Sequence, residues 1–262
     1  MNALRIAVIS SPRSGNTWVR SVLGDILRLQ QFAVHNYIEL ENIPDRCIVQ
    51  LHWYREPNLQ RFLNDRRFKT LVLARHPLDV LVSILNFIRH EPKTARWLEG
   101  NAEIPPSLAG QAPTSQDFLK YSKSWGAENV LGVSYQWWHD PDAIKVRYEE
   151  LVQRPHEALL NLARVFDPAA RDEDDAIGRF GLPFFQGLPN KHGWQGRPDL
   201  WRQLIVYSDA RAIYRRHKRI FDVMGYSVRP YLLTRAAALQ RWKELTLEKG
   251  IGPVHQEPQR AG

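Results

Sequence analysis

The stretch "VISSPRSGNTWVRSVL", residues 8–23, joins a short apolar run to a loop of small residues that holds one arginine. The apolar run begins earlier, as "LRIAVIS" at 4–10, and its β-branched residues are typical of a buried strand. From Thr17 onward, apolar residues recur at helical spacing as far as Leu29. The stretch therefore predicts a strand, a tight loop and a helix in succession.

The loop between this strand and this helix has the composition of an anion-binding site. The first N–H groups of a helix have no partner within the helix and point toward such a loop, where the helix dipole adds roughly half a positive charge. Arg13 adds a full charge with several donors, and Gly15 allows close approach of the backbone or a positive φ. Ser14, Asn16 and Thr17 add short polar side chains. A plain strand-to-helix turn capped by Ser or Thr is the alternative that these residues leave open.

This loop differs from the nucleotide-binding pattern G-x-x-x-x-G-K-[ST]. No Gly stands five residues before Gly15, and no Lys follows it. The sequence offers no compelling set of magnesium ligands either, so we expect no bound metal. The loop is therefore predicted to hold a phosphate-like group without being a nucleoside triphosphatase site.

Further short apolar runs alternate with helical patterns along the chain. Strands are predicted at "CIVQLHW" (47–53), "KTLVLAR" (69–75) and "IKVRYEEL" (144–151). A helix is predicted at 77–90, where Pro77 suits the first turn, and one or two more at 149–166. This alternation predicts one α/β domain over 1–262, with three α/β/α layers around a mostly parallel sheet.

Composition and charge restrict the class of partner. Of the 262 residues, 44% are hydrophobic and 24% are charged, which is ordinary for a soluble globular protein. The formal net charge of +8 and the pI of about 9.7 favour an anionic partner, without choosing among a nucleotide, a polyanion, an acidic lipid and a nucleic acid. The basic residues form no stripe with interleaved aromatic residues, so we expect no nucleic-acid partner.

Cysteine use and apolar runs bear on the compartment. The single Cys47 excludes an internal disulfide and fits a reducing compartment. No apolar run approaches the roughly 18–20 residues that a membrane span needs. The apolar part of the N-terminal segment is too short for a secretory signal. We therefore expect a cytoplasmic protein.

A second candidate anion site lies in "ARHPLDVLVS", residues 74–83. Arg75 is predicted at the carboxyl end of a strand, where ligands of parallel sheets bind. Ser83 is predicted in the second turn of the following helix, near the same edge. Together they could hold a second phosphate, with the guanidinium bidentate. An exposed arginine and an ordinary helix serine are the alternative.

Both segments resemble one enzyme family, the sulfotransferases. "SPRSGNTW" (11–18) is similar to the family's Pro-Lys-Ser-Gly-Thr-Thr-Trp loop, and "RHPLDVLVS" (75–83) to its Arg-Asn-Pro-Lys-Asp-x-x-x-Ser pattern. The resemblance implies a P-loop-like sulfotransferase fold and the donor 3′-phosphoadenosine 5′-phosphosulfate. It also implies roles in donor binding: the 5′-phosphosulfate on Arg13, Ser14, Gly15, Asn16 and Thr17, the adenine on Trp18, and the 3′-phosphate on Arg75 and Ser83.

Two later segments resemble the same family less closely. "VRYEEL" (146–151) is similar to a family segment whose Tyr lies near the nucleotide, which implies that place for Tyr148. "NKHGWQG" (190–196) is similar to the Arg-Lys-Gly loop, which implies donor contacts for Lys191, His192 and Gly193. Core packing of Tyr148 and a basic surface loop at 187–199 are the alternatives.

A hydroxyl acceptor must lose its proton as it attacks sulfur, and a positioned histidine suits that task. Of nine histidines, His52 ends the second predicted strand, between the phosphate loop and Arg75. "QLHW" (50–53) resembles the family's Lys-Thr-His stretch, with Gln50 in place of the Lys. We therefore predict that His52 is the base and that Arg13 stabilises the leaving phosphate. The alternatives for the base are His35, His76, His192, Glu39 and Glu41.

The predicted reaction moves a sulfuryl group in line from the donor to a hydroxyl or, less favoured, an amine, and leaves 3′,5′-adenosine bisphosphate. A kinase-like phosphotransferase and a non-enzymatic polyanion binder are the alternatives. The acceptor is a small molecule, a glycan or a lipid, and the sequence does not choose among them.

Several segments are candidates for the acceptor side. Region 91–140 is expected to form the acceptor pocket, with aromatic faces from Tyr135, Trp137 and Trp138, and packing in a helix core is the alternative for at least one of the two tryptophans. The Pro/Gly/Ala-rich surface loop at 99–115 is either a lid or a plain connection. A terminal amphipathic helix is predicted at 231–250, within a 231–262 end that frays. That helix could dock on its own domain or on a second subunit, so a homo-oligomer is possible.

Overall fold

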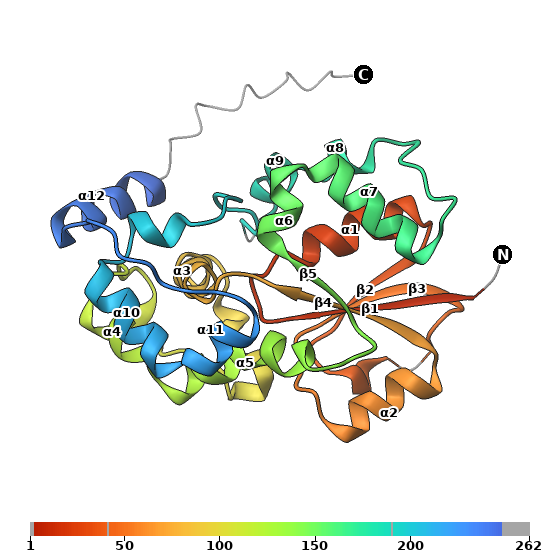
Figure 1. Ribbon diagram of the computed structural model, residues 1–262, viewed down its shortest axis with the longest axis horizontal. Coiled ribbons are helices and arrows are strands. Elements are labelled where there is room, and N and C mark those ends of the chain that lie inside the picture. Colours follow the sequence, from red (N-terminus) through yellow and green to blue (C-terminus); the bar gives the residue numbers. More distant parts are fainter. Residues whose placement is uncertain (1–2, 41, 190, 248–262) are drawn as a thin grey trace, which may run out of the picture.

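The computed structural model describes residues 3–40, 42–189 and 191–247. Its centre is a five-stranded sheet in the order β2-β3-β1-β4-β5, and every pairing is parallel (Figure 1). The strands are β1 Leu4–Ser10, β2 Gln30–Ala33, β3 Arg46–Leu51, β4 Phe68–Ala74 and β5 Ile144–Arg147. This confirms the predicted parallel α/β architecture.

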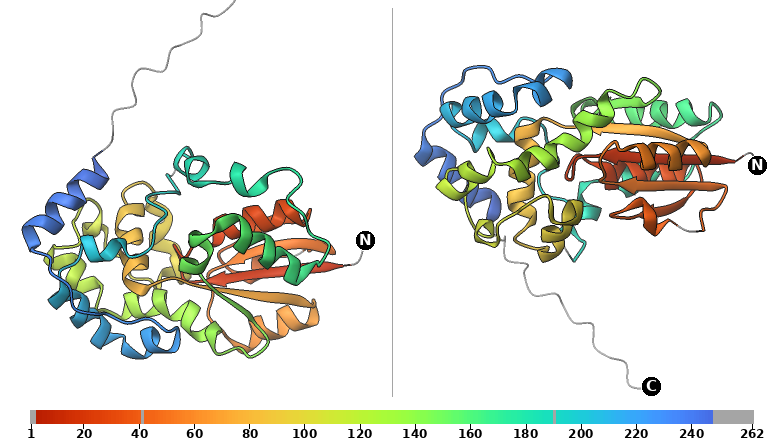
Figure 2. Two further views of the ribbon diagram at one scale, coloured as in Figure 1. Left: turned by 45° about the horizontal axis from the view of Figure 1, so that its top comes forward. Right: turned by 90° about the horizontal axis from the view of Figure 1, so that it is seen from below.

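Helices cover both faces of the sheet, so the inner strands are apolar on both sides. Along β1, Ile6 and Val8 pack with α1 and α7, whereas Ala7 and Ile9 join the core that α2, α3 and α5 cover. This alternation follows from the two-residue period of a strand. The two further views of Figure 2 show the sheet between these helical layers.

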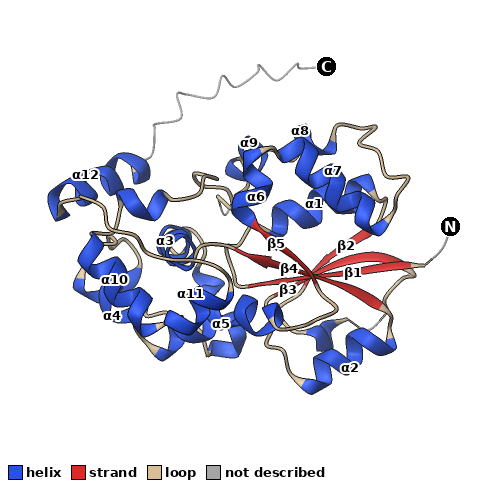
Figure 3. Cartoon of the chain, viewed as in Figure 1, coloured by secondary structure: helices blue, strands red, loops and turns tan. Residues whose placement is uncertain are grey.

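The helices are distributed along the whole chain, and Figure 3 colours them blue. The longer ones are α1 Asn16–Ile26, α2 Pro57–Asp65, α3 Pro77–Phe87, α5 Trp125–Trp138, α7 Pro155–Phe166, α10 Tyr207–Arg216 and α12 Arg235–Thr246. The shorter ones are α4 Gln116–Tyr121, α6 Tyr148–Gln153, α8 Ala176–Arg179, α9 Leu182–Gln186 and α11 Lys218–Val223. The 3₁₀ segments are η1 Tyr37–Glu39, η2 Pro92–Gly100, η3 Pro106–Leu108 and η4 Leu200–Gln203.

The carboxyl ends of the strands meet at one edge of the sheet. The β1–α1 loop, His52 after β3 and Arg75 after β4 each follow a strand at this edge. Helix α3 lies just beyond it, toward α10–α12 (Figure 1), and each of its residues is buried. The topology therefore concentrates the predicted site residues on the side of the sheet where α3 begins.

Two element predictions were wrong. The predicted first helix extends to Leu29, but α1 ends at Ile26, and β2 follows at the sheet edge with mostly exposed glutamines that carry no strand pattern. The predicted strand at 144–151 is the short β5 followed by α6, so Tyr148 begins a helix. Glu149 and Glu150 lie in the first turn of that helix, where its dipole favours acids.

The segment 99–115 runs along the surface as its composition predicts, and Ala102, Ile104 and Leu108 anchor it in the core. The terminal helix is confirmed as α12, which buries Ala238 and Trp242. Its expected frayed end beyond 247 lies outside the described residues. Within the described ranges, none of the helices combines the length and the apolar character needed to cross a bilayer.

Candidate functional site

The β1–α1 loop is fixed in a conformation that few sequences allow. Arg13 and Gly15 both have a positive φ, 68° and 93°. At Gly15 a Cβ atom would lie 2.6 Å from Cδ2 of Tyr148, so any larger residue collides with that ring. The Ser11 N–H donates to Ser134 Oγ at 2.7 Å, which ties the loop to α5. The loop is therefore held from two sides before any ligand binds.

Arg13 points across the carboxyl edge of the sheet toward α3. Its Nε donates to Ser83 Oγ at 3.2 Å, its Nη2 donates to the His192 carbonyl at 2.6 Å, and its guanidinium lies 4.2 Å from the centre of the Phe87 ring. Burial, with the nearby charge of Arg75, lowers the pKa of Arg13 to about 9. A buried cation destabilised in this way favours an anionic ligand.

Arg75 lies beside Arg13 on the same edge. Its Nη1 donates to the Arg13 carbonyl at 3.0 Å, and its guanidinium lies over the Tyr148 ring at 4.6 Å. Tyr148 in turn donates from its hydroxyl to the Gly196 carbonyl at 2.8 Å. The two arginines thus come from different strand ends and converge.

A cavity of about 390 Å³ opens between these arginines. Its polar wall includes Arg13, Asn16, Thr17, Arg75 and Ser83, and its apolar wall includes Trp18, Tyr148, Val152, Leu182 and Phe185. Trp18 meets Tyr148 edge to face, with ring centres 6.1 Å apart. One end therefore suits anionic groups, and the other suits a flat ring.

Several buried donors around this cavity have no hydrogen-bond partner among the described residues. Arg75 Nε belongs to a lining residue, and Ser14 Oγ and Arg197 Nε belong to residues next in sequence to lining residues. Such orphaned donors are rare in folded proteins and indicate a ligand that accepts their hydrogen bonds. A phosphorylated ligand with an aromatic ring fits these residues. In the described part of the chain, no group of three or more His, Cys, Asp or Glu side chains could hold a metal ion.

His52 lies next to this cavity, separated from it by Asn16. The ring Nδ1 lies 2.8 Å from the Ser10 carbonyl, and since a carbonyl only accepts, Nδ1 carries the proton. Nε2 is then the acceptor, 3.0 Å from Asn16 Nδ2. Burial lowers the pKa of His52 to about 4. The ring is therefore neutral at physiological pH, with a basic nitrogen facing the phosphate loop.

His192 closes the site from the C-terminal part of the chain. Its Nε2 lies 2.8 Å from Thr17 Oγ1, which also donates to Gln50 Oε1 at 3.2 Å. Burial, with the charge of Arg13, lowers the pKa of His192 to about 3. His192 and Gly193 line the cavity, and Lys191 precedes them with a φ of 46°. Residues 191–198 are thus half-buried, and those from His192 to Gly196 line the cavity.

Of the other candidates for the base, His192 lies in the site itself, and His35 is near enough to His52 for its charge to lower the pKa of that ring. His76 is buried and stacked on Trp201 at 4.7 Å. His35 is exposed, and Glu39 accepts from the backbone N–H groups of His35 and Asn36 in a helix cap. Glu41 lies outside the described residues.

Of the three aromatic candidates for the acceptor side, Trp137 is a core residue. It is 1% exposed, and its indole N–H donates to the Trp53 carbonyl. For Trp137 the structure therefore shows the alternative, packing in the helix core. Tyr135 and Trp138 are half-buried.

Sequence reasoning missed two residues of this region. Arg20 lies one helical turn after Asn16, its Nε is buried without a hydrogen-bond partner among the described residues, and burial lowers its pKa. Its spacing from Asn16 and Thr17 on one helix face could have indicated it. Asp79 is 1% exposed behind Arg75, and the motif that contains it gave no hint of its contacts.

Comparison with known proteins gives a consistent result. A family model described as the sulfotransferase domain matches residues 4–175. The crystal structure of mouse sulfotransferase SULT7A1 complexed with PAP is similar with a TM-score of 0.63 at 16% identity, over 86% of this chain and 87% of that one. No curated protein matches the chain.

A second similar crystal structure is that of retinol dehydratase in complex with androsterone and inactive cofactor PAP. Its TM-score is 0.55 at 15% identity, over 88% of this chain and 83% of that one. Retinol dehydratase in a complex with retinol and PAP gives a TM-score of 0.56 at 15% identity, over 88% and 84% of the two chains. Likeness at these identities shows the fold.

Proposed function

The chain belongs to the sulfotransferase domain family, and we propose that it moves the sulfuryl group of 3′-phosphoadenosine 5′-phosphosulfate to a hydroxyl group of an acceptor. One observation carries this proposal: Arg13 and Arg75 open onto the same cavity of about 390 Å³. The solved structures of similar fold were crystallised with PAP, the product that such a donor leaves behind. Two cations in one cavity suit a donor with two separated phosphates.

The donor would lie across the strand ends. Arg13, the side chains of 14–17 and the first N–H groups of α1 would hold the 5′-phosphosulfate. Arg75 and Ser83 would hold the 3′-phosphate, since a guanidinium can bind a phosphate through two parallel hydrogen bonds. Trp18 and Tyr148 would hold the adenine on the apolar wall. Lys191, His192 and Gly193 would close over the donor.

His52 would act as the base through Nε2. The Ser10 carbonyl holds the Nδ1 proton, so Nε2 keeps the lone pair that receives the acceptor proton. As the acceptor oxygen bonds to sulfur, the bond between sulfur and the bridging phosphate oxygen breaks, and Arg13 stabilises the charge that develops on that phosphate. Positioning and electrostatics then supply most of the acceleration.

For the acceptor, the proposal concerns the side from which it approaches His52. A hydroxyl acceptor must reach Nε2 of His52, which Asn16 separates from the donor cavity. We propose that the acceptor, a small molecule, a glycan or a lipid, approaches beside residues 91–140, where Tyr135 and Trp138 are half-buried.

Transfer of labelled sulfate tests the roles of Arg13 and His52. Arg13→Ala should lower kcat about 100- to 1,000-fold, by analogy with a lost oxyanion donor. His52→Ala should lower kcat about 100-fold or more, because general-base catalysis is lost. His156→Ala is the matched control, because His156 is exposed and is not a candidate for the base, and it should leave the rate unchanged. Full activity in either of the first two variants contradicts the role assigned to that residue.

Ligand-induced stabilisation separates this function from the alternatives. The melting temperature should rise with 3′,5′-adenosine bisphosphate and not with Mg-ATP, because ligand that binds only the native state stabilises it. A response to Mg-ATP alone supports a phosphotransferase instead. Salt-sensitive binding of nucleic acid or another polyanion without a response to either nucleotide supports the non-enzymatic binder.

A further inference from the structure

One segment, residues 191–199, covers the donor cavity and is here called the cover segment. His192 contacts Thr17, the Gly196 carbonyl accepts from Tyr148, and the Arg197 carbonyl accepts from Arg75 at 3.5 Å. Each contact joins the cover segment to a residue that lines the cavity. The position of this segment therefore determines whether the cavity is closed on that side.

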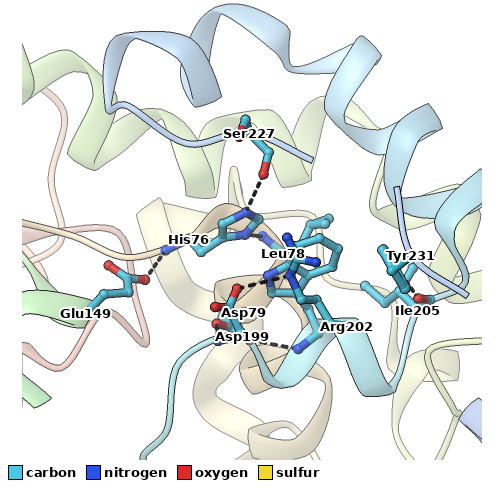
Figure 4. Close-up of polar contacts among 10 residues, drawn as sticks. His76, Leu78, Asp79, Glu149, Asp199, Arg202, Ile205, Ser227 and Tyr231 are labelled. Carbon is cyan, nitrogen blue, oxygen red and sulfur yellow. Dashed lines mark hydrogen bonds and ion pairs between the residues drawn. The ribbon is translucent and has the colours of Figure 1, made fainter. Parts of the chain in front are cut away.

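A single buried carboxylate fixes the C-terminal end of the cover segment. Asp79 lies in the first turn of α3, and its Oδ2 accepts from the Asp199 N–H at 2.8 Å. Its Oδ1 accepts from the Trp201 N–H at 3.0 Å, and Figure 4 shows Asp79 beside Asp199. Asp199 has a φ of 58°, and η4 begins directly after it. Both carboxylate oxygens are thus used to turn the chain from the cover segment into η4.

Asp79 is buried where a carboxylate without hydrogen-bond donors would be unstable, so the two N–H groups stabilise it. Asp79 is 1% exposed and forms no salt bridge among the described residues. Burial raises its pKa to about 6, the charge of Glu149 also raises it, and Arg75 and the two N–H groups lower it. A carboxylate is retained in such a place where its hydrogen bonds serve the structure or the activity.

A neighbouring histidine holds the other side of the same turn. His76 stacks on the Trp201 indole at 4.7 Å with an interplanar angle of 17°. Its backbone N–H donates to Glu149 Oε1 at 2.8 Å, so His76 is itself fixed against α6 (Figure 4). Asp79 therefore hydrogen-bonds the backbone of both Asp199 and Trp201, and His76 packs on the Trp201 side chain.

We propose that Asp79 is a positioning residue that anchors the cover segment over the donor cavity and thereby sets the affinity for the donor. The identity of the ligand rests on the proposed function, whereas the anchor itself consists of two hydrogen bonds from backbone N–H groups to Asp79. Asp79 stands four residues after Arg75, so the same short stretch of chain would bind the 3′-phosphate and hold the cover segment above it.

Two substitutions and one control test this anchor. Asp79→Asn keeps the shape but places an amide donor opposite one N–H group, and Asp79→Ala removes both acceptors. Leu63→Ala in α2 is the control, because Leu63 is a buried core residue whose loss lowers stability without touching the cover segment. Amide hydrogen exchange at Asp199 and Trp201 reports on the anchor directly. Titration with 3′,5′-adenosine bisphosphate reports on the donor site.

The expected result is selective. Both Asp79 variants should lose exchange protection at Asp199 and Trp201 while Leu63→Ala keeps it. The dissociation constant of the bisphosphate and the KM of the donor should rise about 10-fold in Asp79→Asn and about 100-fold in Asp79→Ala, as expected for lost hydrogen bonds to a charged group. The kcat at saturating donor should stay within about threefold, since a bound donor restores the closed segment.

Three results would overturn the inference: unchanged protection at both amides in the Asp79 variants, unchanged bisphosphate affinity in them, or an equal rise of the dissociation constant in Leu63→Ala. If Asp79→Ala does not fold, the near-isosteric Asp79→Asn decides by the same criteria. A wild-type protein that does not bind the bisphosphate contradicts the proposed function, and the amide exchange then decides the anchor alone.

Discussion

At the scale of single residues, the site contains positions where a single added carbon atom would collide with a neighbouring side chain. Gly15 illustrates this, because its φ of 93° and the Tyr148 ring both exclude a side chain. The same ring lies under the Arg75 guanidinium and beside Trp18. A change at Gly15 therefore propagates to both ends of the donor cavity.

We predict that Gly15→Ala lowers bisphosphate affinity at least tenfold and destabilises the fold by about 1–3 kcal/mol, from backbone strain and the displaced ring. The affinity is measured by calorimetric titration and the free energy of unfolding by urea denaturation. Gly132→Ala in α5 is the matched control, because its Cβ would meet only Gln136 Nε2, at 3.9 Å. That control should be neutral or stabilise the helix by up to about 1 kcal/mol. Equal binding by both variants contradicts the role of Gly15.

At the scale of elements, the buried strands and the helices next to them could be predicted from the sequence. Strands β1, β3 and β4 are covered on both faces, so their apolar runs identify them. β2 could not be predicted, because it is a short edge strand whose side chains are mostly exposed. The end of β5 was missed because Val146 and Tyr148 fit a strand pattern although Tyr148 begins α6.

The candidate site follows the same division. Residues that follow a strand within one to three positions, namely Arg13, His52 and Arg75, were predictable because the carboxyl ends of parallel strands meet at one edge. Asp79 was not assigned a role from sequence, since its partners lie 120 and 122 residues away. Contacts of that kind depend on tertiary packing, which local patterns do not encode.

A serine on α5 connects one element to the site loop, and this gives an element-scale prediction. Ser134 Oγ accepts from the Ser11 N–H and donates to the Leu73 carbonyl, both at 2.7 Å. Ser134→Ala removes both of these buried hydrogen bonds and should lower the free energy of unfolding by about 1–3 kcal/mol. Urea denaturation measures this. The exposed Ser107→Ala is the control and should stay within about 0.5 kcal/mol of wild type. Equal losses in the two variants would remove the special role of Ser134.

At the scale of the whole molecule, buried titratable groups set the response to pH. Burial lowers the pKa of His52 and of His76 to about 4 and that of His192 to about 3, whereas an unfolded histidine titrates near 6.5. Between about pH 6.5 and pH 4 the unfolded chain therefore binds more of these protons, which favours unfolding. Asp79 acts in the opposite direction, because its raised pKa of about 6 lets the folded state hold a proton that the unfolded state has lost.

Three histidines outweigh one aspartate, so the melting temperature should fall as the pH is lowered from about 7 to about 4. Calorimetry across this range, at constant ionic strength and without ligand, measures the effect. His52→Asn should make the fall shallower, and the exposed His156→Asn should not change it. A melting temperature that is constant across the range contradicts the neutral, buried state of these rings.

The cover segment brings a late part of the chain to the cavity that the first loop begins. The family model ends at residue 175, yet His192, Gly193 and Gly196 complete the cavity that begins with Arg13. A nucleotide seated there would touch the first twenty residues and the last third of the polypeptide at once. Its binding would join distant parts of the chain, and a chain that ended at residue 175 would lack the residues that complete the cavity.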